Sequence, residues 1–148
     1  MKDSVQDCHD FFMKGFPQSG PKNFRTQVGI MFEEIAETVA QLEASKPEDL
    51  ILLTYLGQAI KQAGEHFKNT DGVVGIKDRV ELLDGLCDIM VTAVGVGRHA
   101  NMDVPGGFKE VNRSNNSKFG ENGEPILDNN LKLIKGPLYT KPDLKSFV

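Results

Sequence analysis

The stretch VGIMFEEIAETVAQL, residues 28–42, decides the fold, because its apolar side chains return every three or four residues. That spacing places them on one stripe of an α-helix, where they can face a core. The stripe consists of Val28, Met31, Phe32, Ile35, Val39 and Leu42. The period therefore predicts a helix over about residues 22–44, with acidic side chains on the face away from the stripe.

The same period predicts further helices on both sides of this stretch. A short helix is expected over 3–14, and another begins near residue 46 at a capping box formed by Ser45 and Glu48. The connection between this helix and 22–44 is short, so the two should be antiparallel neighbours. A helix from residue 74 or 78 to about 100 is apolar nearly all round, which predicts that it is buried.

Proline and glycine, which disfavour the interior of a helix, follow the predicted apolar helix. Pro105, Gly106 and Gly107 are expected to end the apolar helix, and a last short helix is expected over about 108–118. Beyond Lys118, glycine, asparagine and proline dominate, and residues 126–127 and 131–134 flank a turn that would suit a small β-hairpin. The prediction is an all-α protein with a bundle of four or five helices. It forms a single domain over 1–148, with an irregular C-terminal arm over about 118–148.

Composition excludes several classes of partner. The net charge is −4, whereas a protein that binds a nucleic-acid polymer usually carries a basic face. No apolar run reaches 18 residues, so no membrane partner is expected. The N-terminal residues lack the basic start and apolar stretch of a signal peptide, which predicts a cytoplasmic protein. Cys8 and Cys87 are then expected to be free thiols.

Two groups of acids have helical spacing. Glu33, Glu34 and Glu37 form the first group, and Glu81, Asp84 and Asp88 form the second. Positions three or four apart face the same way on a helix. The chain has 21 acidic residues, so roughly three such pairs arise by chance. The first group is equally explained by a solvated helix face, and Glu81 is also explained by a capping box with Asp78.

The second group is harder to explain as a surface feature, because its helix has almost no other polar side chains. Lys77, Glu81, Asp84 and Asp88 lie within about 60° of one another on a helical wheel. Three carboxylates in one strip of a buried helix would repel each other and lose solvation. Either the strip faces water or a cation lies there. With no histidine at helical spacing, the all-oxygen ligand set indicates Mg²⁺, or Mn²⁺, and hence phosphate chemistry.

These motifs resemble a known superfamily. Glu33 to Glu37 followed by Glu81 to Asp84 is similar to the EExxE…ExxD signature of the all-α nucleotide pyrophosphohydrolases, which include MazG-like enzymes, dimeric dUTPases and phosphoribosyl-ATP pyrophosphohydrolases. The stretches 110–118, 122–125, 135–139 and 142–144 resemble the C-terminal signature of the small MazG-like branch. Together the similarities span about residues 24–144.

The resemblance implies a hydrolase that converts a nucleoside triphosphate, NTP or dNTP, and water into the monophosphate and pyrophosphate, with a water activated by metal. It implies Mg²⁺ held by four carboxylates, namely Glu34, Glu37, Glu81 and Asp84. It makes Glu33 and Glu34 the candidate catalytic residues. The candidate substrate-binding residues are Asp88, Asn112, Asn115, Lys118 and Lys135. It also implies a homodimer or a tetramer, because the bundle of this superfamily is completed between subunits.

Two other functions stay open on the sequence. One is a non-catalytic helical interaction module, in which the acids form a solvated face and the C-terminal arm binds a partner. The other keeps the reaction but acts on a phosphoribosyl nucleotide. No residue pattern identifies the preferred base or sugar.

Overall fold

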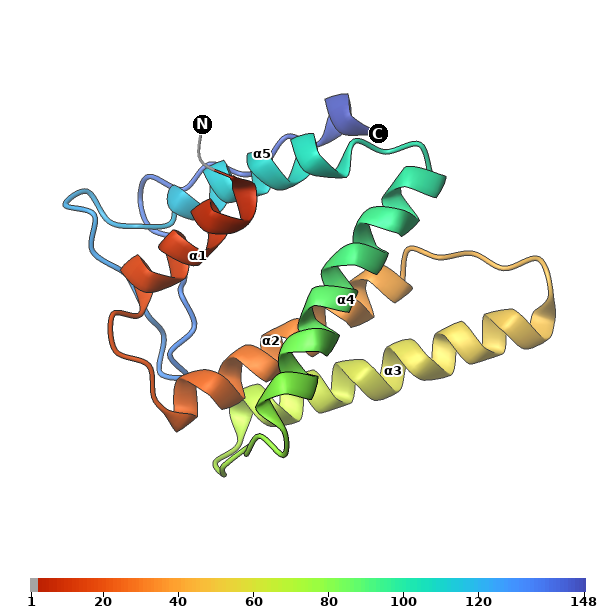
Figure 1. The fold of residues 1–148 in the computed structure, drawn as a ribbon, viewed down its shortest axis with the longest axis horizontal. Helices are drawn as coiled ribbons and strands as arrows, with labels where there is room; N and C mark the ends of the chain where they lie inside the picture. Colours follow the sequence, from red (N-terminus) through yellow and green to blue (C-terminus); the bar gives the residue numbers. More distant parts are fainter. Residues whose placement is uncertain (1–2) are drawn as a thin grey trace. The chain divides into compact units, whose positions relative to one another are not determined.

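A computed structural model describes residues 3–148, which form five α-helices and one short 3-10 helix (Figure 1). Within these residues no strand is present, so the predicted all-α class is confirmed. None of the described helices is long and apolar enough to cross a membrane. The elements are α1 (Ser4–Gly15), α2 (Pro21–Val39), α3 (Pro47–Asn69), α4 (Arg79–His99), α5 (Val104–Asn116) and η1 (Lys145–Phe147).

The chain divides into two compact units. Unit 1 contains α1, α4, α5 and η1, and comprises residues up to 18, 75–126 and 133–148. Unit 2 contains α2 and α3, and comprises residues 19–74 and 127–132. The first acidic group therefore belongs to unit 2 and the second to unit 1.

Unit 2 is built on an antiparallel pair of helices, as the short connection predicts (Figure 1). The helices approach closely where Gly29 of α2 meets Gly64 of α3. A Cβ atom at either glycine would lie 2.9 Å from the carbonyl oxygen of the other. Further along, a Cβ at Gly57 would lie 3.5 Å from Val39. Glycine at the crossing thus allows backbone-to-backbone contact that any side chain would prevent.

The boundaries of this helix pair differ from the prediction. α2 ends at Val39, and residues from Ala40 to Lys46 form the connection. α3 begins at Pro47 with Lys46 as its N-cap, and no side chain caps it, so the capping box predicted from Ser45 and Glu48 is wrong. Lys46 is extended (φ −94°, ψ 132°), the conformation imposed on a residue before proline. The proline itself therefore sets the start of α3.

A short piece of the C-terminal arm, residues 127–132, packs on the helix pair. Lys22 Nζ donates to the Asn129 carbonyl (2.9 Å), and Thr26 Oγ1 donates to the Asn130 carbonyl (2.9 Å). Asn130 Nδ2 donates to Asn69 Oδ1 at 3.3 Å. The predicted hairpin is present in a minimal form, without a full strand: Leu127 and Leu133 are β-bridge residues, Asp128 N–H donates to the Lys132 carbonyl (3.0 Å), and Ile134 N–H donates to the Ile126 carbonyl (2.9 Å).

Unit 1 has a small aromatic core. Phe11 of α1 packs edge-on against Phe119 at 5.6 Å between ring centroids, and Leu133 joins them. Asn112 of α5 ties the two helices together, because its Nδ2 donates to the Ser4 carbonyl at 2.8 Å. Both contacts hold α1 against α5 and the residues that follow it.

α5 begins earlier than predicted. Asp103 is its N-cap and accepts a hydrogen bond from the Gly106 amide at 3.0 Å, with Pro105 in the first turn. The expectation that Pro105, Gly106 and Gly107 interrupt the helical structure is therefore wrong, because all three residues lie in the first turn of α5. Proline lacks the N–H that the first turn of a helix leaves unpaired, so it suits this position.

α4 is not buried within the single chain, which contradicts the prediction from its composition. Gly97 is its one buried residue. The most exposed apolar side chains are Val80 (74%), Val91 (67%), Leu83 (63%) and Val96 (63%). An apolar helix left this open presents a large surface that water solvates poorly.

Candidate functional site

The first acidic group lies in the second half of α2. Glu33 is half-buried, whereas Glu34 and Glu37 are exposed. Glu34 and Glu37 are three residues apart and share a face, as the helical period requires. Glu33 and Glu37 both line the groove between α2 and α3.

Glu33 forms an ion triad with two lysines. Lys68 Nζ of α3 lies 2.5 Å from Glu33 Oε1, and Lys132 Nζ of the arm lies 3.4 Å from Oε2. The hydrogen bond from Lys68 is the main reason that the pKa of Glu33 lies below its ordinary value, with the charge of Lys132 adding to it and burial opposing it. A carboxylate with a lowered pKa is a poorer proton acceptor. The triad therefore favours a positioning role for Glu33 over a role as base.

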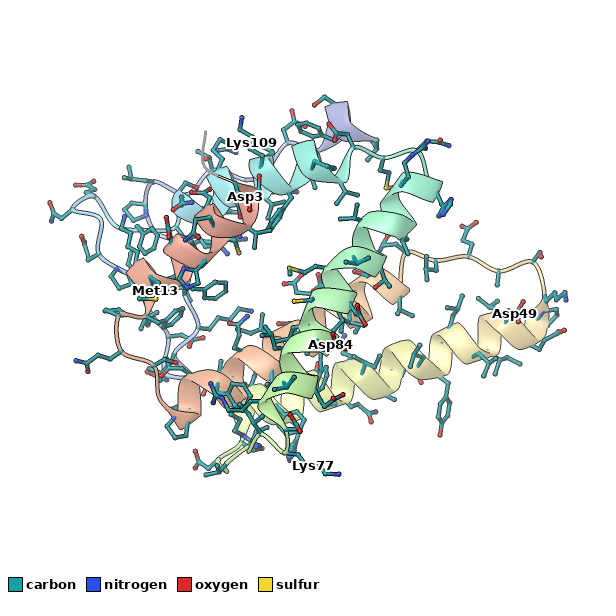
Figure 2. The ribbon with its side chains drawn as sticks, in the orientation of Figure 1. Asp3, Met13, Asp49, Lys77, Asp84 and Lys109 are labelled. Atoms are coloured by element: carbon teal, nitrogen blue, oxygen red, sulfur yellow. The ribbon has the colours of Figure 1, made fainter. Side chains whose placement is uncertain are left out.

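The second acidic group lies in the first half of α4, where Figure 2 labels Asp84. Glu81, Asp84 and Asp88 are all exposed. Asp78 caps the helix by accepting from the amides of Val80 (2.8 Å) and Glu81 (3.2 Å). Within residues 3–148 the Glu81 side chain makes no hydrogen bond back to Asp78, so a capping box does not account for Glu81.

The donor chemistry of both groups fits Mg²⁺, because every candidate ligand is a carboxylate that reaches solvent. In the described part of the chain, no three His, Cys, Asp or Glu side chains lie together as a set that could hold an ion. The two acidic groups belong to different units of the chain. The four-carboxylate centre remains a prediction.

A groove of about 670 Å³ runs between α2 and α3 beside the first acidic group. Near Glu33 and Glu37, its walls carry the polar side chains of Gln58, Lys61 and Glu65. Toward the connection between the helices, the lining is apolar, with Leu42, Leu50 and Leu53. The volume lies in the range of small-molecule pockets, and the lining would suit a ligand with one anionic and one apolar part.

Glu110 and Arg113 of α5 hold the C-terminal arm on this helix. The Arg113 guanidinium makes two hydrogen bonds to the Glu110 carboxylate (2.8 and 2.7 Å) and also donates to Thr140 Oγ1 and the Lys141 carbonyl. Glu110 also accepts from the Asp143 amide at 3.0 Å. Arg113 and this amide together lower the pKa of Glu110 to about 2. We call Glu110, Arg113 and the segment 140–143 the arm clamp.

The predicted substrate-binding residues are in different situations. Asn112 is 2% exposed and donates to Ser4, so we assign it to the fold. Asn115 and Lys118 are half-buried at the end of α5 and just beyond it. Lys135 is exposed, with Nζ 4.8 Å from the centre of the Tyr139 ring. Asn115 and Lys118 therefore stay candidates, and Lys135 is partly engaged by an aromatic face.

Three cations that the sequence reasoning missed gather in unit 2, namely Arg25, Lys68 and Lys132. Lys68 and Lys132 belong to the triad with Glu33. Arg25 is 7% exposed and lies one turn before the buried Gly29 on α2. A charged residue in register with the buried face was the signal in the sequence that could have found it.

Comparisons of the chain with models of protein families, with curated proteins and with solved structures found no match.

Proposed function

We propose that the protein is a Mg²⁺-dependent nucleoside triphosphate pyrophosphohydrolase of the cytoplasm. The observation that carries the proposal is the strip of three exposed carboxylates on α4, on a helix whose remaining surface is mostly apolar. In the single chain the strip faces water, which solvates its charges; once assembly covers α4, the strip loses part of that solvation and a bound cation would offset its charge. The exposed Glu34 and Glu37 on α2 supply the matching second group.

In this proposal, Glu34, Glu37, Glu81 and Asp84 hold the metal, and Asp88 assists from the next turn of α4. Bound Mg²⁺ neutralises phosphate charge and makes water a better nucleophile. The groove beside Glu37 accommodates the nucleoside, with its apolar end against the base. Glu33 is held by Lys68 and Lys132 and fixes the position of α2 against α3. We assign the acceptance of a proton to Glu34, the other candidate catalytic residue of the motif.

The protein also needs a partner surface, and we propose that a second copy of the chain covers α4 in a homodimer or a tetramer. Side chains such as Val80 and Val91 are too exposed for a stable single chain to leave them so. A helix with apolar residues on every side is suited to a position between other helices. Assembly would bury this surface while the acidic strip faces the substrate.

The test is the release of pyrophosphate and monophosphate from a panel of NTPs, dNTPs and phosphoribosyl nucleotides, with Mg²⁺ and with a chelator. Turnover is expected with Mg²⁺ only, and it should be abolished by Glu37→Gln and by Asp84→Asn in protein that remains folded. Glu43→Gln is the matched control, because Glu43 is exposed and lies outside both motifs. Retained turnover in either motif variant would contradict the assignment of the site.

The exposed apolar surface of α4 also favours a second candidate, a non-catalytic interaction module. That function predicts no turnover on any nucleotide and no effect of Mg²⁺ on the melting temperature. A metal-dependent rise in melting temperature, lost in Asp84→Asn, would exclude it, because a ligand that binds the folded state stabilises that state.

A further inference from the structure

A second cavity in unit 2 lies apart from the acidic groups. It has a volume of about 230 Å³ and is formed by the start of α2, the end of α3 and the turn that follows α3. Its lining includes Lys22, Arg25, Lys68, Asn69, Asp71 and Asn130. Arg25 precedes Glu33 by eight residues, which is about 12 Å along the helix axis. The cavity is thus a separate feature from the groove beside Glu37.

Arg25 is a buried cation with only neutral partners in the described residues. Its Nε donates to the Thr70 carbonyl (2.9 Å), its Nη2 donates to Thr70 Oγ1 (2.7 Å), and its guanidinium lies 4.9 Å from the centre of the Phe67 ring. With 7% of the residue exposed, the charge has lost most of its contact with water. Buried charges are normally paired with an opposite charge, which the described part of the chain does not supply here.

One nitrogen of the Arg25 guanidinium remains available to the cavity that Arg25 lines. A guanidinium has five N–H donors, and the two bonds to Thr70 leave Nη1 without a partner among residues 3–148. The described residues contain no fully buried side-chain nitrogen that lacks a partner, so Nη1 keeps contact with solvent. Since Arg25 is otherwise buried and lines the cavity, that contact is through the cavity.

The neighbouring groups reinforce a positive site. Lys22 is exposed at the rim, with its Nζ held at the Asn129 carbonyl. The start of α2 contributes amides that have no acceptor within the helix, together with the positive end of the helix dipole. Asp71 is the one carboxylate in the lining, against the cations of Arg25 and Lys22, because the third cation of the lining, Lys68, is paired with Glu33.

We propose that this cavity binds a phosphate-type oxyanion, with Arg25 as the buried anchor and Lys22 as the cation at the rim. The volume is too small for a whole nucleotide, since drug-sized ligands occupy about 300–1,000 Å³. It suits one phosphate group, either free phosphate or the terminal group of a phosphate monoester. Arginine is suited to this role, because its planar fork of N–H groups matches the oxygens of phosphate.

The test is a titration of the full chain with inorganic phosphate in the presence of a chelator, followed by amide NMR. Saturable shifts are expected at Thr70, Asp71 and the first amides of α2. Arg25→Gln should weaken binding about tenfold or more, because it removes a charge-assisted donor. Lys22→Gln should weaken binding by a smaller factor. Lys61→Gln is the matched control, since Lys61 lines the groove between α2 and α3 and not this cavity.

Gly72→Ala gives a second variant in case Arg25→Gln fails to fold. Gly72 has φ 139°, and a Cβ there would lie 3.3 Å from Arg25 Nη1, so the variant should weaken phosphate binding while Arg25 is retained. The same titration with AMP separates the two sources: tighter binding of AMP than of phosphate identifies a monoester, and equal binding identifies free phosphate. Either result supports the site.

Three results would overturn the proposal. One is the absence of saturable binding at millimolar phosphate, and another is binding that Lys22→Gln and Gly72→Ala both leave unchanged. The third is phosphate binding that requires Mg²⁺ and is lost in Glu37→Gln, which would place the anion at the carboxylates. Because the titration contains a chelator and measures no turnover, its failure is distinguishable from failure of the proposed hydrolase activity.

Discussion

At the scale of single residues, Glu33 shows how an acidic motif can contain members with different roles. The sequence pattern treats Glu33, Glu34 and Glu37 as equivalent carboxylates on one helix. In the structure Glu33 is bound by Lys68 and Lys132, whereas Glu37 is exposed and forms no ion pair within residues 3–148. Partners from α3 and from the arm, far apart in sequence, make this difference.

We expect Glu33→Gln to destabilise the protein by about 1–3 kcal/mol, because the Lys68 side chain is only 12% exposed and its ammonium would lose its counter-charge. The measurement is the free energy of unfolding in urea without metal. Glu37→Gln, on the same helix, is the control and should change it by less than about 0.5 kcal/mol. Equal effects of the two substitutions would show that the triad contributes nothing specific.

At the scale of elements, the helices were largely predictable because their signals are local. The apolar period and the turn residues predicted all five helices, and the short connection predicted the antiparallel arrangement of α2 and α3. The errors concern the starts of two helices, and a proline lies in the first turn of each. α3 begins at Pro47 without a capping box from Ser45, and α5 has Pro105 in its first turn where the end of a helix was expected.

The candidate site was less predictable than the helices, since its chemistry depends on contacts between distant segments. Helical spacing alone could group Glu81 with Asp84, and both are exposed on α4. It could not show that Asn112 is used by Ser4 or that Arg113 holds residues 140–141. Those roles are fixed by partners 27 or more residues away in the sequence.

The packing of α2 against α3 at Gly29 and Gly64 should not tolerate even the methyl group of alanine. Gly29→Ala would place a Cβ 2.9 Å from the Gly64 carbonyl, and we expect it to destabilise unit 2 by about 1–3 kcal/mol. Gly57→Ala on α3 is the control, since its Cβ would have an ordinary contact of 3.5 Å with Val39. That change should be neutral or stabilising by up to about 1 kcal/mol, because alanine favours a helix. Urea unfolding measures both, and equal effects would contradict the close approach.

The arm clamp should respond to acid. The pKa of Glu110 is lowered from 4.5 to about 2, so its contribution is fully present above about pH 4.5 and is lost as the pH falls through 2. We expect the amide NMR signals of Thr140 and Asp143 to move over that range. In Glu110→Gln the signals of Thr140 and Asp143 should show no pH-dependent change over that range. Arg113→Lys should loosen the segment 140–143 at neutral pH, because lysine lacks the planar fork of N–H groups that arginine presents. Signals that titrate near 4.5 in the unaltered chain would argue against the clamp.

At the scale of the whole molecule, the exposed apolar surface of α4 predicts self-association. Val91→Asp should shift the protein toward monomer in sedimentation velocity, because it puts a charge on a surface that is proposed to be buried between copies. Arg79→Gln, at the first position of α4, alters the net charge by the same single unit and should leave the assembly unchanged. A monomeric unaltered chain would contradict the proposed assembly and leave the exposed α4 side chains without an explanation.

The position of residues 127–132 in unit 2 has a consequence for synthesis on the ribosome. The α2–α3 pair is complete in the nascent chain by residue 74, yet the carbonyls of Asn129 and Asn130 and the ammonium of Lys132 emerge much later. At roughly 5–20 residues per second, that delay lasts several seconds. During it the pair must persist with Glu33 bound by Lys68 alone, so a nascent chain stalled before residue 127 should be cleaved by protease more readily within α2 than the finished protein.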